Sequence, residues 1–69
     1  MKTLYIGNGM YQIVKTDIRF RLYSGFNGEW SNKPHFSNED INQIFEYISK
    51  SEMIDIKIII AKYKELNYE

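Results

Sequence analysis

The 69-residue chain contains no cysteine, one proline, one histidine and four glycines. Without cysteine, no disulfide can stabilise the fold and no thiolate can bind a metal ion. A single histidine is too few for a typical zinc site, which draws on several histidine or cysteine ligands. We therefore expect no metal and no other cofactor, and the hydrophobic core alone has to stabilise the fold.

Net charge is also absent, because nine lysine and arginine residues balance nine aspartate and glutamate residues. Proteins that bind nucleic acids usually carry a basic excess, so such a role would need a local patch. No apolar run approaches the roughly 18 residues that cross a bilayer, and no signal peptide is recognisable. The expectation is a cytoplasmic protein that has no membrane partner.

The composition itself is that of a folded domain, with 43% hydrophobic and 16% aromatic residues. These values argue against intrinsic disorder. The length predicts a single small α+β domain that spans residues 1–69. A chain of this size buries only about 60% of its unfolded surface, so its stability margin is narrow.

β-favouring residues and turn signals predict an N-terminal antiparallel β-meander of three to four strands. The Asn27-Gly28 pair is typical of a type I′ turn between the last two strands. The expected strands are residues 2–6, 10–15, 18–23 and 29–31.

The segment 18–23 has the clearest alternation of apolar and polar side chains, which is the pattern of a half-buried strand. The side chains expected to face the core are Ile18, Phe20 and Leu22. The side chains expected on the opposite face are Arg19, Arg21 and Tyr23.

Residues 38–50 are predicted to form a helix that packs on this sheet. Ser37 is a suitable N-cap, and Asp40 three residues later fits the reciprocal position. An apolar stripe at helical spacing covers the core, and its residues are Ile41, Ile44, Phe45 and Ile48.

Residues 52–66 are compatible with a strand or with a second helix. A strand would align Ile54, Ile56, Ile58 and Ile60, but Ile59 breaks that alternation. A helix explains more of the segment, so we favour it. It would leave Ile54 and Ile58 on its outer side.

No catalytic constellation is present. His35 is the only candidate general base, and its place in a loop after Pro34 is equally explained by simple exposure. No pair of acids and no nucleophile motif accompanies it. We therefore expect no enzymatic activity.

The preferred hypothesis is a small non-enzymatic module for protein–protein interaction. Tyrosine, tryptophan and arginine often dominate binding energy at such interfaces. The AT-rich style of residue usage suggests a phage or mobile-element factor of a low-GC bacterium that inhibits a host enzyme or defence complex. For Trp30, the alternative to a binding role is that its side chain fills one end of the core. The candidate partner-binding residues are Arg19, Arg21, Tyr23, Phe26, Trp30 and His35.

Two other hypotheses remain open. The first is a nucleic-acid-binding protein with a basic and aromatic sheet face formed by Lys15, Arg19, Arg21 and Tyr23. The second is a self-associating accessory subunit or homodimer, whose contact includes the outer isoleucines of a C-terminal helix.

Overall fold

The computed structural model describes residues 3–26 and 28–67. In this part of the chain, five strands precede two helices. Neither described helix is long and apolar enough to cross a membrane. The predicted α+β arrangement of a β-meander followed by helices is confirmed. The elements are β1 (Leu4–Ile6), β2 (Gly9–Lys15), β3 (Phe20–Phe26), β4 (Glu29–Trp30), β5 (Phe36–Asn38), α1 (Ile41–Glu52) and α2 (Ile56–Asn67).

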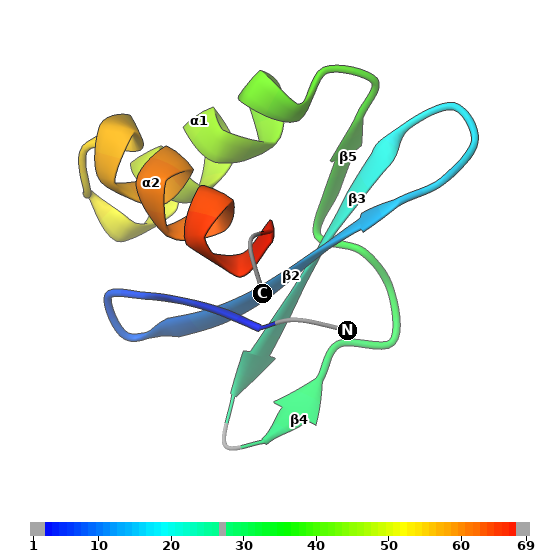
Figure 1. The fold of residues 1–69 in the computed structure, drawn as a ribbon. Helices are drawn as coiled ribbons and strands as arrows, with labels where there is room; N and C mark the ends of the chain where they lie inside the picture. Colours follow the sequence, from blue (N-terminus) through cyan, green and yellow to red (C-terminus); the bar gives the residue numbers. More distant parts are fainter. Residues whose placement is uncertain (1–2, 27, 68–69) are drawn as a thin grey trace.

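The sheet is antiparallel and is built around β3 (Figure 1). The strands β1, β2 and β3 follow one another as a meander. The opposite edge of β3 is shared by two short strands: β4 pairs with its end at Gly25, and β5 pairs with its beginning around Leu22. The register between β2 and β3 places Ile13 opposite Leu22. Both helices lie on the same side of the sheet.

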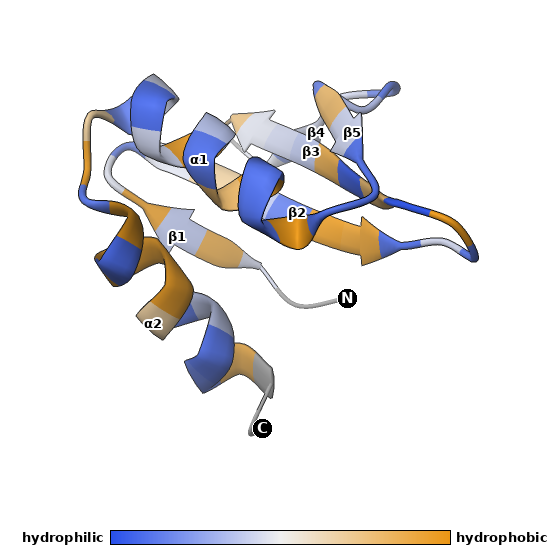
Figure 2. Ribbon diagram, turned by 90° about the horizontal axis from the view of Figure 1, so that it is seen from above, coloured by the Kyte–Doolittle hydropathy of each residue, from blue (hydrophilic) through white to orange (hydrophobic). Residues whose placement is uncertain are grey.

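The core lies between the two helices and the side of the sheet that faces them. Figure 2 shows α1 in front of the sheet and α2 beside β1, with hydrophobic segments in the helices and in the strands. Phe20 is half-buried and packs against the core, whereas Leu22 and Ile44 are fully buried, as the sequence predicted. The fully buried side chains are Ile6, Leu22, Ile44, Ile48 and Ile59.

The predicted start of the first helix at residue 38, with Ser37 as its cap, is wrong. The N-cap is Asp40, whose Oδ1 accepts a hydrogen bond of 2.9 Å from the Asn42 N–H. Ser37 instead lies in β5, opposite Arg21. Both residues are good caps, and strand pairing with β3 decides between them, because it holds residues 36–38 in an extended conformation.

The expected orientation of Ile18 is wrong, and strand pairing also decides the orientation of Tyr11. Ile18 is 77% exposed because it belongs to the connection between β2 and β3 and precedes the first paired residue, Phe20. Tyr11 is buried because it lies opposite Leu4 and so shares the core face.

The second helix is confirmed, and it begins at Ile56 and not at residue 52. Asp55 supplies the cap, since its Oδ1 accepts a 2.9 Å hydrogen bond from the Lys57 N–H. Ile54, expected on the outer side, packs against the core, whereas Ile58 is 49% exposed.

A side-chain contact ties the end of α1 to β2, close to the turn that precedes this strand. The Tyr11 hydroxyl donates a hydrogen bond to Glu52 Oε2. The Glu52 carboxylate also lies so close to the turn that a Cβ atom on Gly9 would be 2.8 Å from Oε2. Gly7 has a positive φ of 56°, which a glycine adopts without strain. Glu52 therefore joins helix and sheet through a partly buried charged group.

The residue that ends α1 gives a first prediction. Met53 has φ 57° and ψ 44°, a left-handed conformation that is unfavourable for a residue with a Cβ atom, and its side chain is 91% exposed. We expect Met53→Gly to raise the free energy of unfolding by about 0.5–1 kcal/mol, because backbone strain is removed and little packing is lost. Urea denaturation followed by circular dichroism measures this change. Met53→Ala keeps the strain, and an equal gain in that variant would contradict the explanation.

Candidate functional site: an open face of the sheet

The side of the sheet that faces away from the helices forms a continuous surface. Tyr23 lies opposite Gln12, and Arg21 lies opposite Val14. Gly25 has Met10 on one side and Trp30 on the other. Tyr5 extends this row onto β1, where it lies opposite Met10. We call this surface the open face and define it by its side chains on β1 to β4, which are Tyr5, Met10, Gln12, Val14, Arg21, Tyr23 and Trp30.

The open face is apolar and aromatic, with little charge. Three of its seven residues are aromatic, and Arg21 is the only charged one. Tyr5 is 65% exposed, and Arg21 is also exposed. The other five are half-buried against their neighbours in the sheet. The face therefore offers largely apolar surface that remains in contact with water.

Trp30 belongs to this face and not to the core. It is half-buried, and it is not among the residues that pack against the core cluster. Its indole rests on Gly25, since a Cβ atom added there would lie 3.0 Å from Trp30 Cε3. A glycine opposite the tryptophan thus lets the ring lie close to the backbone of β3.

A pocket of about 300 Å³ lies within the open face. Two of the side chains that line it are aromatic, one is aliphatic and two are uncharged and polar. These are Tyr23, Trp30, Val14, Gln12 and Ser31. The Ser31 backbone N–H donates a 3.0 Å hydrogen bond to the Ser24 carbonyl, which holds Ser31 beside β3.

The polar groups of this pocket have no partners within the described residues. The Ser31 hydroxyl oxygen is buried and makes no hydrogen bond with residues 3–26 or 28–67. The Trp30 indole N–H, the Gln12 amide and the Tyr23 hydroxyl also make none in the described part of the chain. Buried polar groups are usually hydrogen-bonded, so the Ser31 hydroxyl is an exception that calls for an explanation.

The predicted basic residues do not form one patch. Arg21 is on the open face, and Arg19 reaches the same edge, where its Nη1 donates a 3.2 Å hydrogen bond to Ser37 Oγ. Lys15 lies opposite Phe20 on the helix side of the sheet, with its Nζ 6.0 Å from the centre of that ring. Arg21 and Tyr23, the two members of the predicted nucleic-acid site that lie on the open face, are therefore on the opposite side of the sheet from Lys15.

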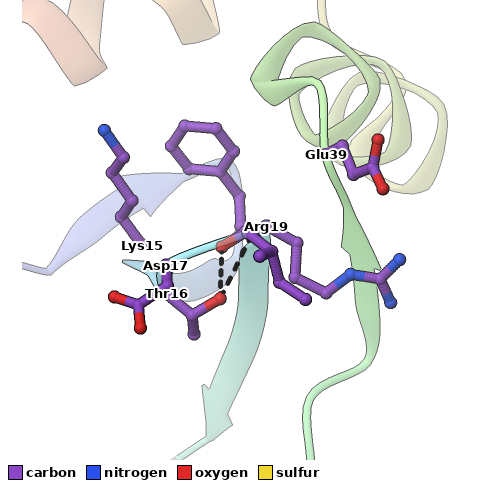
Figure 3. Close-up of a pocket in the computed structure, with 7 residues that line it drawn as sticks. Lys15, Thr16, Asp17, Arg19 and Glu39 are labelled. Carbon is purple, nitrogen blue, oxygen red and sulfur yellow. Dashed lines mark hydrogen bonds between the residues drawn. The ribbon is translucent and has the colours of Figure 1, made fainter.

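A second hollow, of about 280 Å³, lies at the connection between β2 and β3 (Figure 3). Its charged residues are mixed in sign: Lys15 and Arg19 are basic, whereas Asp17 and Glu39 are acidic. Figure 3 shows the Lys15 and Arg19 side chains extending in opposite directions. The hollow therefore has no concentration of one charge that would attract an anion.

Phe26 and His35 are the remaining predicted binding residues, and both are exposed. Phe26 is exposed at the end of β3, opposite Glu29, and strand alternation directs it away from the side of Gly25. His35 is exposed beside β3, where its backbone N–H donates a 2.8 Å hydrogen bond to the Leu22 carbonyl. The structure thus brings Arg21, Tyr23 and Trp30 together, with Arg19 at the edge.

Sequence reasoning missed the half of the open face that comes from β1 and β2. Tyr5, Met10, Gln12 and Val14 belong to segments that were expected to be strands. Their common orientation follows only from the register of β1 with β2 and of β2 with β3. Alternation in residues 10–15 is weak, because apolar side chains occur on both faces, so no signal indicated the outer set.

Neither a search for metal ligands nor comparison with known proteins gives further information about this site. Among the residues that the structure describes, no cluster of three or more histidine, aspartate or glutamate side chains could hold a metal ion. Comparison with known proteins gives no family model, no curated protein and no solved structure that matches the chain significantly.

Proposed function

We propose that the protein is a non-enzymatic interaction module that binds another protein through the open face. The observation that carries this proposal is the composition of that face. The centres of protein–protein interfaces are enriched in tyrosine, tryptophan, methionine and arginine and depleted in lysine, aspartate and glutamate. The open face has two tyrosines, one tryptophan, one methionine and one arginine, and it has no lysine and no acid.

Two features favour a protein over a nucleic acid as partner. Binding to phosphates depends on lysine and arginine side chains that neutralise several charges along the backbone. The open face supplies Arg21, with Arg19 at its edge, while Lys15 lies on the other side of the sheet. The net charge of zero adds no general attraction for a polyanion.

Self-association through α2 has less support than the sequence suggested. Ile54 packs against the core, so Ile58 alone of the two outer isoleucines is strongly exposed. A non-enzymatic module of this size would act by occupying a surface of its partner. Inhibition of a host enzyme or a defence complex is the kind of activity that we propose for it.

Position-specific photo-crosslinking tests this proposal in cells that express the protein. Benzoylphenylalanine replaces Tyr5, which is an exposed aromatic residue of the open face. In a matched variant it replaces Lys57, which is exposed on α2. We expect a discrete protein adduct from position 5 and none from position 57. Adding Trp30→Ala to the first variant is expected to remove the adduct.

The same experiment separates the competing hypotheses. An adduct that nuclease treatment removes would favour nucleic-acid binding, and an adduct of twice the chain mass would favour a homodimer. Equal labelling from positions 5 and 57, or no adduct from either, would contradict the proposal. Circular dichroism of the Trp30→Ala variant verifies that loss of the adduct is not loss of the fold.

A further inference from the structure

The pocket between Tyr23 and Trp30 restricts the chemistry of the segment that the partner inserts, if the open face is its docking surface. None of the five side chains that line the pocket is charged. A carboxylate, phosphate or ammonium group that entered it would lose hydration without gaining a counter-charge. The segment that fits is therefore neutral.

The aromatic walls favour a ligand with flat, rigid apolar groups. Tyr23 and Trp30 come from the adjacent strands β3 and β4, and the indole lies against Gly25. Gly25 also has Met10 close by, since an added Cβ atom would lie 2.8 Å from Met10 Cε. The Trp30 indole is thus supported by the backbone of β3 and forms one wall of the pocket.

The unpaired polar groups call for a ligand rich in hydrogen-bond acceptors. The Trp30 indole N–H can only donate a hydrogen bond. The Gln12 amide and the hydroxyl groups of Tyr23 and Ser31 can donate as well, and none of the four has a partner within the described residues. A helix presents few free carbonyl groups on its sides, because its backbone is paired internally.

A polyproline II segment meets all three requirements. It has no internal hydrogen bonds, so its carbonyl groups remain free to accept, and proline has no backbone N–H to leave unpaired. Proline rings are neutral and rigid, and aromatic-lined grooves bind such segments at a low cost in conformational entropy. We propose that the Tyr23–Trp30 pocket binds a proline-rich segment of the protein partner. This inference rests on the function proposed above.

Nuclear magnetic resonance titration of the ¹⁵N-labelled chain provides the test. The probe is a capped octaproline peptide, and the control is a capped Gly-Ser peptide of the same length. We expect saturable shifts of the Trp30 indole N–H and of the Gln12 and Ser31 amides with octaproline only. A saturable response to the Gly-Ser peptide, or none to octaproline at millimolar concentration, would overturn the proposal.

Variants connect the shifts to the pocket. Trp30→Phe keeps an aromatic ring but removes the indole donor, and we expect about tenfold weaker binding of octaproline. Trp30→Ala is expected to weaken binding by about thirtyfold or more. Lys57→Ala, on the opposite side of the molecule, is expected to bind like the original protein. Equal affinity of Trp30→Ala and the original protein would contradict the assignment of the pocket.

Failure of the proline-binding proposal can be distinguished from failure of the proposed function. If octaproline does not bind but Tyr5-directed crosslinking still yields a protein adduct, the proline preference is wrong and the docking face stands. If an octathymidine oligonucleotide produces the pocket shifts and octaproline does not, both proposals are overturned in favour of nucleic-acid binding.

Discussion

Replacing Ile59 with alanine is expected to lower the free energy of unfolding by about 2–5 kcal/mol. Ile59 is the fully buried residue of α2, and it packs in the cluster formed with the sheet and α1. A domain of this length has a total stability of roughly 3–10 kcal/mol. The cavity is therefore expected to bring the variant close to unfolding, which urea denaturation monitored by circular dichroism measures.

The adjacent residue provides a matched control. Ile58 has the same side chain in the same helix, but it is 49% exposed. Ile58→Ala is expected to change stability by less than about 1 kcal/mol, because little packing is lost and alanine is the better helix former. Equal losses in the two variants would show that α2 does not present Ile59 to the core.

Tyr11→Phe is expected to lower the free energy of unfolding by about 1–3 kcal/mol at pH 7. The substitution keeps the buried ring but removes the hydroxyl that donates to Glu52, and hydrogen bonds to charged groups are among the stronger ones. Tyr5→Phe is the control, since Tyr5 is 65% exposed and its hydroxyl makes no hydrogen bond within the described chain. A loss of similar size in both variants would contradict a role for the Glu52 contact.

The same contact predicts a dependence of stability on alkaline pH. Burial raises the pKa of Tyr11 well above its usual value near 10, and the hydrogen bond to Glu52 and the charge of Glu52 raise it further. The neutral phenol is thus favoured in the folded state. Its contribution is complete below about pH 10 and is lost as the pH rises above that value, at up to about 1.4 kcal/mol per pH unit.

Thermal unfolding between pH 8 and 11 measures this loss. We expect the melting temperature of the original protein to fall more steeply above pH 10 than that of Tyr11→Phe, because the variant has no phenol at this position. The two proteins differ only in the phenol hydroxyl of residue 11, so the difference between the two curves isolates Tyr11. Parallel curves would show that Tyr11 does not contribute to the alkaline loss.

The amino-acid sequence predicted the elements whose signals are local. The stripe of Ile44, Phe45 and Ile48 predicted the buried side of α1, and the three side chains are buried. The alternation in β3 placed Leu22 in the core and Arg21 on the other face, as observed. Each of these signals depends on the geometry of one helix or strand and needs no distant partner.

The position of the helix cap and the burial of Tyr11 depended on which segments pair, because the local sequence did not favour one outcome over the other. Ser37 and Asp40 are both good helix caps, and pairing of residues 36–38 with β3 selected Asp40. Tyr11 had no local signal for burial, because its orientation follows from its position opposite Leu4.

The candidate site divides in the same way. Local alternation and residue type predicted Arg21, Tyr23 and Trp30 as candidate binding residues, and these three share the open face. These three residues share one face with Tyr5, Met10, Gln12 and Val14 because four strands are aligned in the observed register. A shift of one strand by one residue would have moved its side chains to the opposite face. The sequence by itself thus determined the elements and much of the core, whereas tertiary pairing alone decided which side chains share the open face, because register is a property of two strands and not of one.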